Sequence, residues 1–124
     1  MAKTVTAAEM KERERAANEA GLLYIQMMEN AGRAAYAELK RRVPALRRLL
    51  IVAGKGNNGG DGFVMARVAA KEGVQVRVLL AEGEPKTADA KTNLARLAET
   101  AAEVVRDTEQ AAFGADAVVD ALYG

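Results

Sequence analysis

The residues best suited to chemistry lie in a glycine-rich stretch at 53–62, which reads Ala-Gly-Lys-Gly-Asn-Asn-Gly-Gly-Asp-Gly. An apolar run at 49–52 precedes it, and a helical pattern begins at Phe63. A strand, a loop and a helix N-terminus in this order direct backbone N–H groups and the positive end of a helix dipole at a bound anion. Glycines suit such a loop because they allow positive φ or the close approach of a ligand. The stretch therefore predicts a site for phosphate or another anion.

A second candidate is Asp120, a carboxylate within the otherwise apolar segment 117–122. A buried carboxylate is costly unless it is paired, hydrogen-bonded or bound to a metal. We interpret Asp120 as part of a cation site or as a polar anchor beside the amide-rich loop. Alternatively, it is the last residue of a strand and accepts hydrogen bonds from neighbouring N–H groups.

Composition excludes several classes of site. The 124 residues are half apolar and 28% charged, as expected of one soluble globular domain, and they contain neither Cys nor His. Disulfides, thiolate nucleophiles, imidazole bases and the usual zinc ligands are thereby excluded. A net charge of +1 gives no general case for nucleic acid or an anionic membrane. No apolar run approaches the length of a membrane span or a signal peptide, so we expect a cytoplasmic protein.

The elements that must position these residues follow from apolar periodicity and from capping residues. Thr6 and Glu9 predict a capping box that opens a helix, Gly21 its end, and Pro44 the end of a second helix. Further strands are expected at 49–52, 74–80, 103–105 and 117–122, and helices at 63–72, from Thr87 to about 98, and at 108–113. This alternation predicts an α/β fold with a parallel sheet covered on both faces.

The expected strand order is 3-2-1-4, with the topological switch point between the first and fourth strands. Ligands of open α/β sheets bind at such a crevice, outside the carboxyl ends of the strands. The order would bring together residues from the glycine-rich stretch and from the end of the chain. They are Asn57, Asn58, Asp61, Asp120, Tyr123 and Gly124.

The spacing of Gly54, Gly56 and Gly59 also matches G-x-G-x-x-G, with Glu82 as a partner for a ribose. This hypothesis of a nicotinamide dehydrogenase depends on a weak motif, and the chain contains no substrate domain. The P-loop pattern fails because no Ser or Thr follows Lys55.

Four separated motifs carry a resemblance to a known family, the NAD(P)H-hydrate epimerases (YjeF N-terminal domain). It extends in order over essentially all 124 residues as a single domain. The motifs are Met28-Glu29-Asn30-Ala31-Gly32, Gly56 to Gly62, Asp89-Ala90-Lys91-Thr92-Asn93 and Val119-Asp120-Ala121-Leu122-Tyr123-Gly124. The resemblance implies a Rossmann-like, three-layer αβα fold and epimerisation of hydrated NADH and NADPH (NADHX and NADPHX), in concert with a dehydratase that acts separately or is fused to it.

The resemblance also implies roles for individual residues. The dinucleotide would be contacted by Asn57, Asn58, Gly59, Gly60 and Asp61. Asn58 and Asp120 would ligate a potassium ion, for which amide and carboxylate oxygens are suitable ligands. The catalytic acid or base stays unassigned, because the Asp that serves this role in the family lies beyond Gly124.

Family members continue past Gly124, so we expect an incomplete domain with impaired activity. The strand at 117–122, read as apolar on both faces, would then lie at the sheet edge and favour a homodimer. An alternative function is a non-catalytic binding or scaffold module, since relatives of that kind occur in RNA-decapping assemblies. Such modules would be expected to lose the polar ligands that Asn58, Asp61 and Asp120 retain here.

Overall fold

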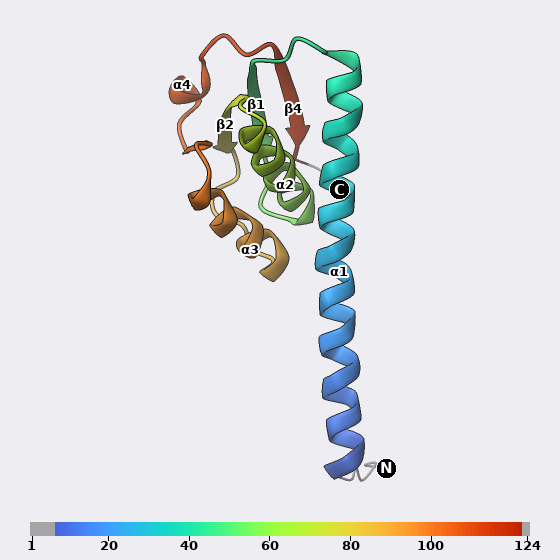
Figure 1. Ribbon diagram of the computed structural model, residues 1–124. Coiled ribbons are helices and arrows are strands. Elements are labelled where there is room, and N and C mark those ends of the chain that lie inside the picture. Colours follow the sequence, from blue (N-terminus) through green and yellow to red (C-terminus); the bar gives the residue numbers. More distant parts are fainter. Residues whose placement is uncertain (1–6, 123–124) are drawn as a thin grey trace.

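A computed structural model describes residues 7–122 as a parallel sheet with helices on both faces (Figure 1). The helices are α1 (Ala7–Arg42), α2 (Asn57–Lys71), α3 (Ala88–Arg96), the 3₁₀ turn η1 (Leu97–Glu99) and α4 (Thr108–Ala111). The strands are β1 (Arg48–Ala53), β2 (Gln75–Leu80), β3 (Glu103–Val105) and β4 (Ala117–Ala121). Every helix within residues 7–122 is too short or too polar to span a bilayer.

The predicted strand order is confirmed. The sheet runs β3-β2-β1-β4, and every pairing is parallel. Ala53, the last residue of β1, lies opposite Leu80 on one side and Ala121 on the other, so three strands end at the same edge. That edge is where the glycine-rich stretch begins.

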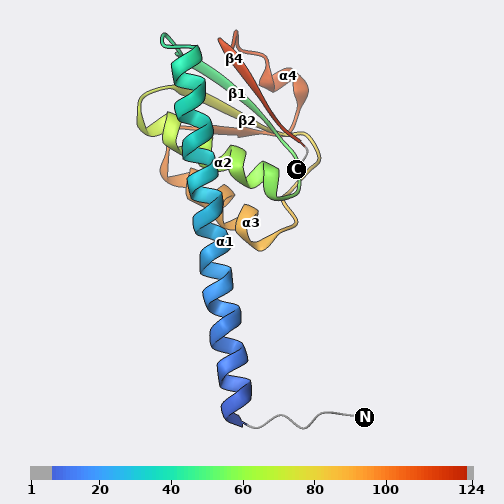
Figure 2. The same ribbon diagram turned by 90° about the vertical axis from the view of Figure 1, so that its right-hand side faces the viewer.

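The predicted break between two N-terminal helices is wrong, because α1 is one helix of 36 residues that continues through Gly21. A glycine in a helix interior costs only about 1 kcal/mol relative to alanine. No proline accompanies Gly21, so the hydrogen-bonded ladder continues through it. The first half of α1 extends away from the sheet (Figures 1 and 2). Thr6, the predicted cap, lies outside the described residues.

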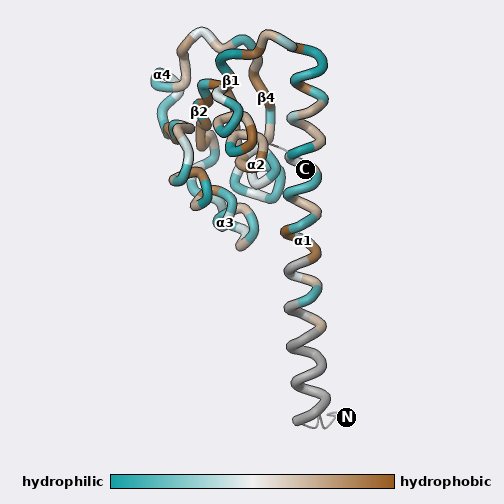
Figure 3. Tube along the Cα trace, viewed as in Figure 1, coloured by the Kyte–Doolittle hydropathy of each residue, from teal (hydrophilic) through white to brown (hydrophobic). Residues whose placement is uncertain are grey.

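The core lies between the sheet and α2, which packs between α1 and α3 (Figure 2). Alternate residues of β1 and β2 point toward α2, and this face contains Leu49, Ile51, Ala53, Val76, Val78 and Leu80, all buried. Phe63 of α2 is fully buried in the same core, and Val64, also fully buried, faces Gly32 of α1. Figure 3 shows the apolar residues of the strands and α2 enclosed by more polar outer helices.

The opposite face of the sheet is covered by the short helix α4 near β2 and β3. Arg77 of β2 fixes this contact by donating from Nη1 to the backbone oxygen of Gln110 at 2.8 Å. Its guanidinium carbon also lies 4.5 Å from the centre of the Phe113 ring. Toward β4 this face is more open, and Val118 is 63% exposed.

The glycine-rich stretch is mostly helix, not loop. We predicted a helix from Phe63, but α2 begins at Asn57, and only residues 54–56 connect it to β1. Among residues 7–122, positive φ occurs at Gly73, Gly83 and Gly114, none of which belongs to this stretch. The glycines of this stretch are therefore not needed for a left-handed backbone conformation. The residues packed around them show what they are needed for.

Candidate functional site

The first turn of α2 lies where β1 and β4 end. Gly54 N donates to Ala121 O at 2.9 Å, and Lys86 N donates to Lys55 O at 2.8 Å. The connection after β1 is thus held between the end of β4 and the segment that follows β2. A side chain at Gly54 would lie 2.6 Å from both Glu82 Oε1 and Leu122 O, so this position requires glycine.

Two further glycines let α2 approach its neighbours. A Cβ on Gly59 would overlap the backbone oxygen of Gly54, and one on Gly60 would lie 2.6 Å from Met28 Sδ. Met28 is itself fixed by Asn93, whose Nδ2 donates to Sδ at 3.1 Å. Both glycines are buried, and they bring the start of α2 close to β1, α1 and α3.

The N-terminus of α2 has no side-chain cap. Gly56 is the N-cap residue, and no side chain among residues 7–122 accepts from the first N–H groups of the helix. The first turn contains Asn57, Asn58 and Gly59, without an acidic residue. Free N–H groups and the positive end of the dipole are therefore available to an anion such as a diphosphate.

The structure brings Asn58, Asp61 and Asp120 together. All three line a cavity of about 160 Å³ that Ala121, Val119 and Met65 also border. The parallel register explains the meeting, because Asp120 lies opposite Val52 near the end of β1. Tyr123 and Gly124, which we expected in the same pocket, lie outside the described residues.

A larger hollow of about 390 Å³ adjoins this cavity and shares Asp61 with it. It is lined by Tyr24, Met27, Met28, Ala31, Asn57, Asp61 and Asp89. The sequence assigned no site role to Tyr24 or Asp89. Asp89 belongs to one of the four motifs, and this membership could have indicated a role in the site. Nothing in the sequence around Tyr24 indicated one.

Asp61 is a carboxyl group of the site whose surroundings raise its pKa. Burial raises the pKa of Asp61 above its ordinary value of 3.8. Its carboxylate accepts no hydrogen bond from residues 7–122, so the cost of partial desolvation is not offset within this part of the chain. A carboxyl of this kind suits the holding and transfer of a proton.

Asp120 is exposed, and its Oδ1 accepts from Leu122 N at 3.0 Å. The alternative that Asp120 accepts from a neighbouring N–H group is therefore correct for this oxygen. Oδ2 has no partner among the described residues and stays available to a cation. The expectation that both faces of the sheet are covered fails at β4, where Val118 and Asp120 are exposed while Ala121 is buried.

Glu82 does not extend as a free ribose partner. Its Oε1 accepts from Lys55 N at 3.1 Å, which closes the side chain over the connection after β1. The residue expected to recognise a ribose in the dehydrogenase hypothesis thus stabilises the loop itself.

Comparisons with known proteins identify relatives of this chain. The family described as YjeF-related protein N-terminus matches residues 24–124. The bifunctional NAD(P)H-hydrate repair enzyme of Coxiella burnetii is 36% identical over 94% of this chain, which covers 24% of that enzyme. The NAD(P)H-hydrate epimerase of Rhodobacter capsulatus is 35% identical over the whole chain, which covers 63% of that protein.

A solved structure shares the fold. The crystal structure of yeast ynu0 superimposes with a TM-score of 0.68 at 26% identity, over 80% of this chain and 46% of the yeast chain. The chain spans about a quarter of the length of the first curated relatives it matches.

Proposed function

Because this chain belongs to the family of YjeF-related protein N-termini, we propose that it binds hydrated NADH and NADPH and provides part of an NAD(P)H-hydrate epimerase. Its relatives in Coxiella burnetii and Rhodobacter capsulatus carry NAD(P)H-hydrate repair and epimerase names. The observation that carries the proposal is the uncapped N-terminus of α2, which opens beside Asn58, Asp61 and Asp120 where β1 and β4 end.

The dinucleotide would bind with its diphosphate at the first turn of α2. Backbone N–H groups of Asn57 to Gly60 would donate to the phosphate oxygens, and the absence of a side-chain cap leaves those groups available. The hydrated nicotinamide ring would then lie in the adjoining hollow, beside Tyr24, Asp61 and Asp89.

The donor set also fits a potassium ion. The Asn58 amide and the free Asp120 oxygen are hard ligands, and they line one cavity. Residues 7–122 contain no cluster of three or more His, Cys, Asp or Glu able to hold a metal ion, so the set suits a weakly held monovalent cation better than zinc. When bound, the ion would supply positive charge next to the substrate.

Inversion of the hydrated carbon requires a proton to be delivered as the hydroxyl leaves as water, and another to be removed when water returns to the opposite face. Among the described residues of the site, Asp61 is the best placed carboxyl for this exchange. Its raised pKa favours holding a proton closer to neutrality than an exposed aspartate would.

The test of binding is a titration of the ¹⁵N-labelled chain with NADH, NADPH and their hydrates. We expect the amide signals of Asn57 to Gly62 to shift, and the hydrates to bind more tightly than the parent cofactors. Asn58→Ala should weaken these shifts, whereas Lys91→Ala on the exposed side of α3 should not. Shifts restricted to residues remote from α2 would contradict the proposal.

Potassium is tested by thermal unfolding in potassium chloride and in tetramethylammonium chloride at equal ionic strength. A cation that binds the native state raises the melting temperature by mass action. Asp120→Ala should remove this difference. Equal midpoints of the unmodified chain in the two salts would eliminate the cation site.

Two partners complete the proposal. A dehydratase would consume the epimer produced, and the relative in Coxiella burnetii is named as bifunctional. A second copy of the chain would pair along the outer edge of β4, which no strand among residues 7–122 covers.

A further inference from the structure

A second hollow, of about 420 Å³, lies on the other side of the crossing between α1 and the layer formed by α2 and α3. Its walls are Ile25, Gln26, Glu29, Arg67, Lys71, Arg96 and Glu99. None of these residues belongs to the site described above. Along α2, helical rise separates Lys71 from Asn58 by about 20 Å. We call this hollow the basic groove.

Arg67 forms the floor of the basic groove. It is only 8% exposed, and its Nη2 donates to Glu29 Oε1. Its Nε is buried and has no hydrogen-bond partner among residues 7–122. Because Nε has almost no accessible surface, a ligand in the groove would reach this guanidinium through Nη1, which forms no hydrogen bond within residues 7–122.

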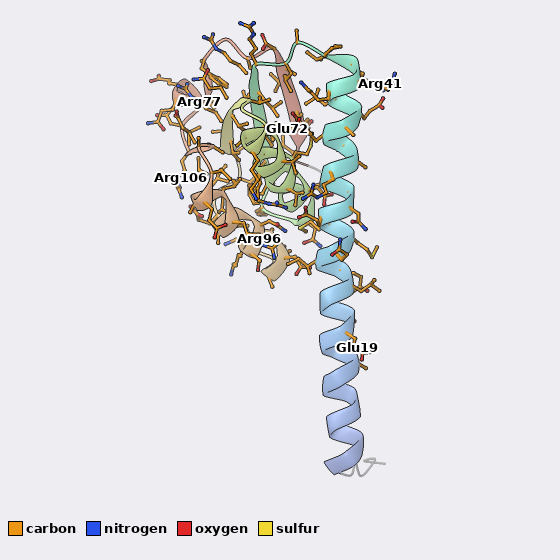
Figure 4. All side chains as sticks on the ribbon, in the orientation of Figure 1. Glu19, Arg41, Glu72, Arg77, Arg96 and Arg106 are labelled. Carbon is orange, nitrogen blue, oxygen red and sulfur yellow. The ribbon has the colours of Figure 1, made fainter. Side chains whose placement is uncertain are left out.

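Two more cations face the same space and lack an ionic partner among the described residues. Arg96 donates from Nη1 to the Asn93 side-chain oxygen at 3.3 Å, a contact with a neutral group. Lys71 forms no ion pair within residues 7–122. Figure 4 shows the position of Arg96 on the outer helical layer.

The acidic residues of the groove do not balance these cations. Glu29 is occupied, because it accepts from Arg67 and also from Arg33 Nε at 2.5 Å. Burial acts to raise the pKa of Glu29, but the two arginines outweigh it and lower that pKa. Glu99 is exposed at the rim. Arg67, Lys71 and Arg96 outnumber Glu29 and Glu99, so the lining of the groove carries a net positive charge of one.

We propose that the basic groove binds a phosphate monoester. A dianionic phosphate accepts from several donors at once and is well matched by arginine groups and a lysine. The volume of the groove exceeds that of a phosphate group, so it also accommodates a small organic part. This site is independent of the proposed function, and it would let a phosphorylated metabolite bind the outer helical layer.

The test uses inorganic phosphate and glycerol 3-phosphate as probes, with chloride added to hold ionic strength constant. The side-chain Nε–H signal of Arg67 and the backbone amides near Lys71 report on binding. Lys71→Gln and Arg96→Gln remove one cation each at exposed positions, and Lys91→Gln makes the same change elsewhere on α3.

We expect saturable shifts of the Arg67 signal with both probes, tighter for glycerol 3-phosphate. Each groove variant should weaken binding by about tenfold, the effect typical of losing one charge-assisted hydrogen bond. Lys91→Gln should leave binding unchanged. Equal weakening in all three variants would reveal charge screening only, and an Arg67 signal that no probe moves would overturn the proposal.

Discussion

Asp61 lines both the small cavity and the larger hollow of the candidate site. Its partial burial lowers the stability of the folded chain and at the same time suits the carboxyl to proton transfer. Its charged form loses part of its hydration without gaining a hydrogen bond from residues 7–122. A carboxyl group whose pKa is raised on folding destabilises the native state once the pH is high enough to ionise it. Sites that perform chemistry commonly retain groups of this kind.

We predict that Asp61→Asn stabilises the chain at neutral pH while weakening dinucleotide binding. The gain should be a few tenths of a kcal/mol to about 1 kcal/mol, because solvent screens a half-buried group. It should disappear as pH falls below 3.8, where the native carboxyl is also protonated. Urea unfolding in potassium-free buffer at several pH values measures this. Lower stability of the variant at neutral pH would contradict the assignment.

Sequence reasoning could bring Asn58, Asp61 and Asp120 together because the first and fourth strands of a parallel sheet end at the same edge. It could not explain Gly59 and Gly60. The atoms that exclude a side chain there belong to Gly54 and Met28, which meet α2 only after packing. From the dense run of glycines we therefore predicted a ligand-binding loop. In the structure Gly59 and Gly60 belong to a helix and allow it to pack closely against its neighbours.

At the scale of elements, two glycines of α1 provide a matched pair. A side chain at Gly21 would meet nothing within 4 Å. One at Gly32 would overlap Val64 and lie 2.9 Å from Asp61 O, where α1 crosses α2. The same substitution should therefore have opposite consequences along one helix.

We predict that Gly21→Ala stabilises the helical state of its segment by about 1 kcal/mol, the difference in helix propensity. Gly32→Ala should lower the free energy of unfolding by about 1–3 kcal/mol through overpacking. Amide hydrogen exchange in α1 measures the first effect and urea unfolding the second. Loss of stability in Gly21→Ala would show that α1 does not pass Gly21 as a continuous helix, and a stabilising Gly32→Ala would show that the crossing with α2 has room for a side chain.

The ion pair between Glu29 and Arg67 joins α1 to α2. We predict that Glu29→Gln costs about 2–3 kcal/mol at neutral pH, because it leaves the buried Arg67 charge without its partner. Since arginines lower the pKa of Glu29, its contribution is complete above its ordinary value of 4.5 and is lost as pH falls through the lowered pKa.

Parallel urea titrations of the unmodified chain and Glu29→Gln between pH 7 and pH 3 measure this loss. Glu109→Gln, at an exposed carboxylate without an ion pair among residues 7–122, is the control. A difference between the chains that stays constant over the whole range would rule out the carboxylate as its source.

Helices and strands could be told apart wherever the spacing of apolar residues agreed with the capping and turn residues beside it. Examples are β2, which follows Gly73, and α3, which Thr87 caps. Thr87 Oγ1 does accept from Ala90 N, and Gly73 has φ of +89°. The course of α1 past Gly21 follows helix propensity and not the stop that we read into this residue, because one glycine costs little among strong helix formers.

At the scale of the whole molecule, the strand order followed from short connections and right-handed crossovers, which leave few arrangements for four parallel strands. Coverage of the sheet was harder to foresee. Whether Val118 meets a helix depends on which face each connection crosses, and the apolar run at 117–122 has the same composition in either case.

We predict that the chain forms a dimer through β4 and that Val118→Lys abolishes it. Lysine on an edge strand opposes pairing with a second copy. The fold should tolerate the change, because Val118 is 63% exposed in the isolated chain. Sedimentation velocity over a range of concentrations measures the result, with Lys91→Gln as a control. A dimer that persists in Val118→Lys would place the interface elsewhere.

The projecting half of α1 has a hydrodynamic consequence. Its 36 residues correspond to a rod of about 54 Å, much of it beyond the sheet and its helices (Figure 1). Such a body diffuses faster along its long axis than across it, and its frictional coefficient exceeds that of a sphere of equal mass. Nuclear relaxation should therefore differ between amides of α1, whose N–H bonds lie near the long axis, and strand amides that point across it.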